Sequence, residues 1–229
     1  RPDGPLLFSG PAEPTARRVL EQVGQAQLVD VSGSDGSRPF LVAALARAAG
    51  DAGPVVVVTA TTREADDLAA ALEAFLPRDA VAVFPSWETL PHERLSPRSD
   101  TVGRRLAVLR RIAHPDPDDT AYGPLSVVVA PVRALLQPLT KGLGDLVPVA
   151  LRAGDERPLE EVVDALVAAA YTRTDLVERR GEFAVRGGIL DVFPPTEEHP
   201  LRVEFWGDEV EEIRAFAVAD QRALEKVER

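Results

Sequence analysis

The chain has 229 residues, of which 45% are hydrophobic, and a formal net charge of −11 at pH 7. This length and apolar content allow one large domain or two small ones, and they exclude disorder as the default state. The acidic balance disfavours non-specific binding to DNA, because neutralising phosphates requires a basic surface. The chain contains no cysteine, which excludes disulfides and thiolate metal sites.

Other site classes also lack support in the sequence. The three histidines, His92, His114 and His199, are far apart and do not have the spacing of metal ligands. No apolar run approaches the roughly 20 residues of a membrane span, and no signal peptide opens the chain. We therefore expect a protein of the cytoplasm, with no membrane segment, metal or cofactor.

The first half of the chain alternates strand and helix patterns. Pro54–Ala60 is a continuous apolar run, typical of a strand that is buried on both faces of a parallel sheet. The expected helices cover residues 14–24, 39–50, 62–76 and 100–114. The expected strands cover residues 26–33, 54–60 and 80–85. Residues 125–136 begin as a strand and continue into a short helix. This alternation indicates a parallel sheet covered by helices.

The pattern changes near residue 140. Residues 157–173 predict a helix, whose apolar stripe is formed by Leu159, Val162, Val163, Leu166 and Val167. Strands at hairpin spacing follow over 182–185, 189–193, 201–206 and 210–217, with a turn at Arg186-Gly187-Gly188. We therefore expect an α/β domain over residues 1–140 and a small α+β domain with an antiparallel sheet over residues 141–229.

The loop after the first expected strand is where a phosphate-binding loop would lie. Gly33 and Gly36 are present there, but no Lys-Ser or Lys-Thr pair follows them. Arg38 precedes Pro39, which removes a backbone donor, and Asp35 adds a negative charge. An ordinary strand-to-helix turn is the favoured interpretation, and a divergent phosphate loop is the alternative.

Two stretches resemble a known family. They are "FPSWETLPHERLSPRSD" (Phe84–Asp100) and the stretch Tyr171–Leu224, which contains "YTRTDLVERRGEFAVRGGILDVFPP" and "HPLRVEFWGDEVEEIRAF". Together they resemble the N-terminal region of the bacterial transcription-repair coupling factors, Mfd, which is similar to the start of the excision-repair helicase subunit UvrB. The resemblance runs in order over nearly the whole chain.

The resemblance implies a fold and a function. The first half would be a degenerate RecA-like helicase subdomain, and the second half would be the small domain that binds UvrA, the damage-recognition ATPase. Full-length factors are longer ATP-dependent translocases that also bind RNA polymerase and double-stranded DNA. This chain would be a non-catalytic part that recruits UvrA. It departs from UvrB in lacking the phosphate-loop lysine and in offering Phe84 and Trp87 where UvrB has a tyrosine-rich hairpin.

Strand alternation and the resemblance together suggest a docking surface. Alternation places Arg202, Glu204 and Trp206 on one face of a strand and Leu201, Val203 and Phe205 on the other. The family pattern implies UvrA contacts at Arg173, Arg186, Arg202 and Glu204, with an aromatic position at Phe183, weaker candidates at Asp175 and Arg179, and Ala184 where UvrB has a further arginine. The alternatives are a solvated outer face without a partner and an ATP-dependent, DNA-binding helicase fragment.

Overall fold

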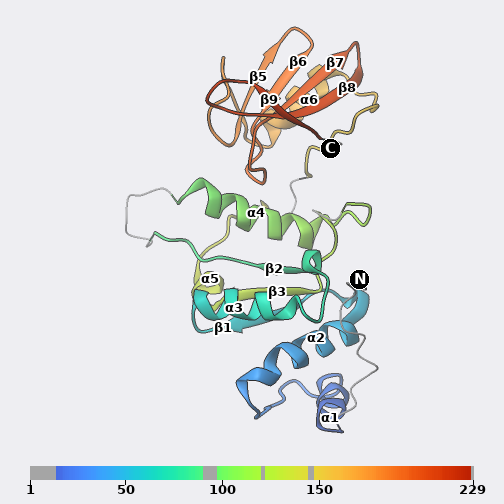
Figure 1. Ribbon diagram of the computed structural model, residues 1–229, viewed down its shortest axis with the longest axis vertical. Helices are drawn as coiled ribbons and strands as arrows, with labels where there is room; N and C mark the ends of the chain where they lie inside the picture. The colour runs from blue at the N-terminus through green and yellow to red at the C-terminus, as the bar shows by residue number, and fades with distance from the viewer. Residues whose placement is uncertain (1–13, 90–96, 120–121, 144–146, 228–229) are drawn as a thin grey trace. The chain divides into compact units, whose positions relative to one another are not determined.

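The computed structural model describes residues 14–89, 97–119, 122–143 and 147–227 (Figure 1). The chain forms two compact units. The first unit comprises Arg1–Ser96 and Ala107–Thr140, and the second comprises Pro97–Leu106 and Lys141–Arg229. Within the described ranges, no helix has the length and apolar character needed to cross a membrane.

The first unit is built on a parallel three-stranded sheet. Its strands are β1 (Val55–Thr59), β2 (Val81–Val83) and β3 (Val127–Pro131), in the order β1-β3-β2. The helices that begin or end in this unit are α1 (Pro14–Val23), α2 (Arg38–Ala49), α3 (Thr62–Leu72), α4 (Ser99–Ala113) and α5 (Val132–Leu136). The predicted α/β class with a parallel sheet is confirmed.

Both faces of the central strand β3 are covered. Val127 and Val129 pack against α2 and α3, which lie on one side of the sheet (Figure 1). Val128 and Ala130 face the opposite side, where Phe84, Leu125 and Ala134 pack together with Val108 of α4. The continuous apolar run of β3 therefore fills two cores at once, as expected for the middle of a parallel sheet.

Two predictions for this unit are wrong. β1 is an edge strand, so only one of its faces is covered, and Val56 and Val58 are 54% and 51% exposed. Residues 26–33 form neither helix nor strand, and Leu28 is largely exposed. A short apolar segment forms a strand only where a neighbouring strand supplies hydrogen-bond partners, and within the described residues none pairs with this segment.

In the part of the chain that the structure describes, the second unit contains a six-stranded sheet and the helix α6 (Leu159–Ala168). The strands run in the order β4 (Thr172–Arg173), β5 (Glu182–Arg186), β6 (Ile189–Val192), β7 (Leu201–Trp206), β8 (Glu209–Phe216) and β9 (Ala223–Val227). Strands β5 to β8 lie where the sequence predicts them, whereas β4 and β9 are additional. Because β4 runs parallel to β5, the sheet is mixed rather than purely antiparallel.

Helix α6 (Leu159–Ala168) ends earlier than its sequence pattern predicts. Ala170 adopts the left-handed conformation, with φ of 64°, and the Tyr171 N–H donates to the Leu166 carbonyl at 2.9 Å. This is the hydrogen bond of a Schellman cap, which stops the helix and turns the chain. The residues after the cap, including Arg173, are therefore released to join the sheet as β4.

The inner face of this sheet packs against α6. Its core consists of Val162 and Leu166 from the helix and, from the strands, Phe183, Leu190, Val192, Val203, Phe205, Val210 and Ile213. The predicted alternation along β7 is confirmed, since Val203 and Phe205 are buried in this core and Leu201 packs against it. Arg202, Glu204 and Trp206 consequently belong to the outer face.

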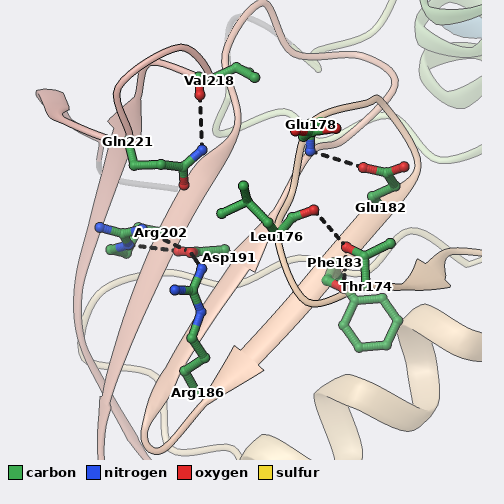
Figure 2. A network of polar contacts seen from close by, with 10 residues as sticks. All are labelled: Thr174, Leu176, Glu178, Glu182, Phe183, Arg186, Asp191, Arg202, Val218 and Gln221. Atoms are coloured by element: carbon green, nitrogen blue, oxygen red, sulfur yellow. Dashed lines mark hydrogen bonds and ion pairs between the residues drawn. The ribbon is translucent and has the colours of Figure 1, made fainter.

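Two loops cover part of the outer face. Val177 from residues 174–181 and Val218 from residues 217–222 pack over Ala184, Phe193 and Phe216. Polar contacts fix both loops. The Glu182 carboxylate accepts the Glu178 N–H at 2.9 Å, and the Gln221 amide donates to the Val218 carbonyl at 3.0 Å (Figure 2). The Glu182 carboxylate also accepts the Arg179 N–H at 2.8 Å. The uncovered part, here called the open face, consists of Arg186, Ile189, Asp191, Arg202, Glu204, Trp206, Glu209, Glu212, Arg214 and Lys226.

Candidate protein-docking site

A buried carboxylate lies at the centre of the open face. Asp191 occupies β6 between apolar neighbours, and its side chain is only 4% exposed. Arg202, its register partner on β7, donates to both carboxylate oxygens, through Nε at 2.6 Å and through Nη2 at 2.8 Å (Figure 2). Arg186 approaches the same carboxylate from β5, with its Nη2 at 3.6 Å. The carboxylate therefore lies between two guanidinium groups, as a buried charge requires.

The side chains of Arg202 and Arg186 are held in place to different extents. The hydrogen bond to Asp191 raises the pKa of Arg202 above its ordinary value, with smaller contributions from the charges of Asp191 and Glu204. Arg202 is about a quarter exposed, and its bidentate geometry fixes the guanidinium plane while leaving further N–H groups unused by Asp191. Arg186 is more than half exposed and only loosely paired. Asp191, Arg202 and Arg186 are here called the first triad. Arg186 is the cation of this triad that can turn toward a partner.

A second triad lies across the sheet. Glu212 on β8 pairs with Arg214 on the same strand and with Lys226 on β9, whose Nζ lies 3.2 Å from the carboxylate. Glu204 stands level with Glu212 in the register, and its charge contributes to raising the pKa of both Arg202 and Arg214. With Glu209, the register partner of Trp206, the open face combines four cations with four carboxylates, although the whole chain has a net charge of −11.

The second triad makes a titration prediction. The hydrogen bonds from Arg214 and then Lys226 lower the pKa of Glu212 below its ordinary 4.5. A lowered carboxyl pKa means that the pairing stabilises the fold above the ordinary pKa and is lost as the pH falls through the lowered one. In a carboxyl-detected NMR titration, Lys226→Ala should raise the pKa of Glu212, and Lys141→Ala should leave it unchanged. Identical Glu212 titration curves in the parent and Lys226→Ala would contradict the triad.

The structure brings together only part of the predicted site. Arg186, Arg202 and Glu204 share the open face. Arg173 lies on β4 in register with Phe183, which faces α6, and Asp175 is exposed in the following loop. Residues in register share a face, so Arg173 lies on the edge strand β4 at the side of the sheet that faces α6, away from the open face. Arg179 is exposed, and its backbone is anchored on Glu182.

Two positions of the family pattern are not available on the surface. Phe183 is completely buried in the core beneath α6, which corrects its assignment to the contact surface. Its strand position decides this, because it alternates with the outward-facing Glu182 and Ala184. Ala184 is itself buried under Val177 and beside Phe216, so the position where UvrB has an arginine is enclosed here.

Sequence reasoning missed Asp191 and the second triad. A signal for Asp191 was present, because a two-residue turn at Gly187-Gly188 pairs Arg186 with Ile189 and therefore Ala184 with Asp191. That register places the Asp191 carboxylate on the same face as Arg186. The second triad depends on β9, whose sequence has no strong strand pattern, and so it could not be found in this way.

Two segments of the first unit correspond to the nucleotide-binding and DNA-binding segments of the helicase alternative. A single 3-10 turn, Asp35–Ser37, leads into α2, and the Arg38 guanidinium pairs with the Asp35 carboxylate at 2.9 Å. Phe84 is buried, and the Trp87 N–H donates to the Gln137 side chain at 2.7 Å. Residues 90–96 lie outside the described residues. No cluster of histidine and carboxylate side chains suited to a metal ion occurs in the described ranges.

Comparison with known proteins identifies the family. Residues 149–229, which include α6 and all six strands of the second sheet, match the UvrB interaction domain. A transcription-repair-coupling factor of Mycobacterium bovis is 56% identical over 217 residues, which make up 94% of this chain and 17% of that protein. The chain belongs to the transcription-repair-coupling factor family. The resemblance drawn from the sequence is confirmed.

Other coupling factors match at lower identity. The Escherichia coli factor is 32% identical over 180 residues, covering 77% of this chain and 15% of the relative. The Bacillus subtilis factor is 29% identical over 208 residues, covering 90% of this chain and 16% of the relative. The chain thus spans about a sixth of the length of the curated coupling factors that it matches.

Proposed function

We propose that this chain is a non-catalytic docking module of a transcription-repair coupling factor and that its open face binds UvrA. The observation that supports this most directly is the pair of guanidinium groups held on a buried carboxylate, within the residues that match the UvrB interaction domain. Asp191 sets the position of Arg202 before any partner arrives, which lowers the ordering cost of binding.

Each charged group has a distinct role in this proposal. Arg186, exposed and loosely paired, offers its guanidinium to a carboxylate of UvrA. Glu204, between the two triads, accepts from a cation and fixes the orientation of docking. Arg173 and Asp175 provide a second, smaller contact at the β4 edge. A full coupling factor would also bind RNA polymerase and double-stranded DNA, through parts of the longer protein outside this chain. ATP-driven translocation would likewise belong to those parts. All of these interactions would take place in the cytoplasm.

For the first unit we propose a degenerate helicase-like domain without a cofactor. Support comes from its parallel sheet with helices on both sides and from the loop at residues 33–38, which has no lysine and whose arginine pairs with Asp35. Phe84, buried in the core, has no free ring face for stacking on bases.

Calorimetric titration of UvrA into the chain tests the docking surface. The parent should bind, and Arg186→Glu should weaken binding by about tenfold to a hundredfold, because a hot-spot arginine is replaced by a repelling charge. Arg222→Glu is the matched control: it makes the same charge change in the same unit on a largely exposed side chain outside the open face. Circular dichroism should show that all three proteins are folded.

Two outcomes would overturn the proposal. If the folded parent fails to bind UvrA at tens of micromolar, the function is wrong. If Arg186→Glu and Arg222→Glu bind equally well, the surface is wrong. The helicase alternative makes a separate prediction in the same set of experiments, namely that Mg-ATP raises the melting temperature of the chain through mass action. We expect no such rise.

A further inference from the structure

A tryptophan stands exposed at one end of the open face. Trp206 is the last residue of β7, and its side chain is 80% exposed. It lies two residues beyond Glu204 on the same face, where the turn through Gly207, with φ of 63°, leads into β8. The phenylalanines of the same sheet and its flanks are all buried, namely Phe183, Phe193, Phe205 and Phe216. Trp206 is therefore set apart from the aromatic residues that fold the unit.

The neighbouring hairpin turn is fixed beside Trp206. The Gly188 carbonyl accepts the Phe205 N–H at 2.8 Å, and a Cβ on Gly188 would lie 2.8 Å from the Phe205 carbonyl oxygen. Only glycine permits this approach of the β5–β6 turn to β7. As a result, Arg186 and Ile189, which flank the turn, lie at the same end of the open face as Trp206.

The five residues at this end form a tip patch, defined as Arg186, Ile189, Glu204, Trp206 and Glu209, the last of which is the register partner of Trp206 on β8. Ile189 is level with Glu204 in the register and is itself 38% exposed. The patch therefore combines an apolar centre, provided by the indole and Ile189, with one cation, Arg186, and two carboxylates, Glu204 and Glu209, at its border. An exposed tryptophan beside an arginine is the composition of an energetic hot spot in a protein interface.

We propose that Trp206 is the apolar anchor of UvrA docking and that it inserts into an apolar pocket of UvrA. The pocket would be bordered by a carboxylate opposite Arg186 and by cationic groups opposite Glu204 and Glu209. This inference rests on the proposed function and deepens it, because the tip patch is continuous with the open face and has the charge pattern that would position the indole. The charged groups set the orientation, and the indole contributes most of the buried apolar area.

Substitution at position 206 tests the anchor. In calorimetry with UvrA, Trp206→Ala should weaken binding at least about tenfold, and Trp206→Phe should weaken it less. Val167→Ala is the control, because Val167 is also an exposed apolar residue of the same unit but lies on α6, against the opposite face of the sheet. It should bind like the parent. Because Trp206 is exposed, its substitution should leave the folded state intact.

A spectroscopic measurement can test the burial of Trp206 in the complex without substituting Trp206. The chain contains two tryptophans, Trp87 and Trp206, so incorporation of 5-fluorotryptophan gives two ¹⁹F resonances, which Trp87→Phe assigns. In the free chain the Trp206 resonance should show a large solvent isotope shift between H₂O and D₂O. Saturating unlabelled UvrA should abolish most of this shift for Trp206 and leave that of Trp87 unchanged.

The outcomes separate this inference from the proposed function. Failure of the parent to bind UvrA overturns both. If the parent binds, Arg186→Glu loses binding and Trp206→Ala binds equally well, then the anchor alone is wrong. An unchanged isotope shift of Trp206 in the saturated complex also overturns the anchor. A Trp206 shift that depends on the concentration of the chain alone, without UvrA, would assign the patch to a second copy and overturn it too.

Discussion

Replacing Phe183 with alanine is expected to lower the free energy of unfolding of the second unit by about 3–5 kcal/mol. The ring is completely buried among Val162, Leu190 and Val203, so its removal forfeits apolar burial and leaves a cavity. Domains are stable by only about 5–15 kcal/mol, so this change brings the unit close to unfolding. Urea denaturation read from the ¹⁹F signal of Trp206 measures the second unit, and the signal of Trp87 reports on the first.

Phe183→Leu serves as the matched variant, because it keeps most of the apolar volume and should cost much less than alanine. The comparison also decides the role of Phe183 in binding. A buried residue affects UvrA affinity only through the fraction of folded chain. Unchanged stability together with lost UvrA binding in Phe183→Ala would return this residue to the contact surface and contradict the packing described above.

The second large effect is expected for Arg202→Met, which should destabilise the second unit by about 2–4 kcal/mol. Removing one partner of a buried ion pair leaves an uncompensated charge, at a typical cost of about 3–5 kcal/mol. The value here should be lower because Arg202 is itself about a quarter exposed and because Arg186 lies 3.6 Å from the same carboxylate. Urea denaturation of the variant gives the number directly.

A double-mutant cycle separates the pair from the rest of the side chain. Asp191→Asn removes the buried charge, so Arg202→Met should cost far less in the Asp191→Asn background than in the parent. Additive effects of the two substitutions would mean that the pair contributes nothing specific. The same reasoning makes Arg186 the informative residue for binding tests, since a charge reversal at Arg202 would place a second carboxylate beside Asp191 and disturb the fold.

The sequence predicted the second sheet well where alternation is strict. Along β7, Val203 and Phe205 alternate with Arg202 and Glu204, and this period alone assigns the inner and outer faces. Alternation within one strand cannot show which residues meet across strands. The burial of Asp191 follows from its register with Arg202, and the second triad follows from the pairing of β9 with β8.

In the first unit, the apolar pattern of a strand did not predict how far the strand is buried. The runs at Val55–Thr59 and Val127–Pro131 are equally apolar, yet only the second is buried on both faces. The difference lies in their order in the sheet, where β3 is central and β1 is at the edge. Strand order depends on tertiary contacts, so composition could not distinguish the two runs. For the same reason the apolar residues of 26–33, predicted as a short buried strand, did not produce one.

The pairing of every cation on the open face within the free chain has a kinetic consequence. Arg186 and Arg202 are already near Asp191, and Arg214 and Lys226 are already near Glu212. A face whose charges are neutralised locally exerts little long-range pull on an approaching protein, so association should not be accelerated by electrostatic steering. We expect an association rate constant in the unsteered range of about 10⁵–10⁶ M⁻¹s⁻¹. Its dependence on ionic strength should come from the net charge of −11 rather than from the open face. Differences in affinity between variants of the open face would then appear in the lifetime of the complex rather than in the rate of encounter.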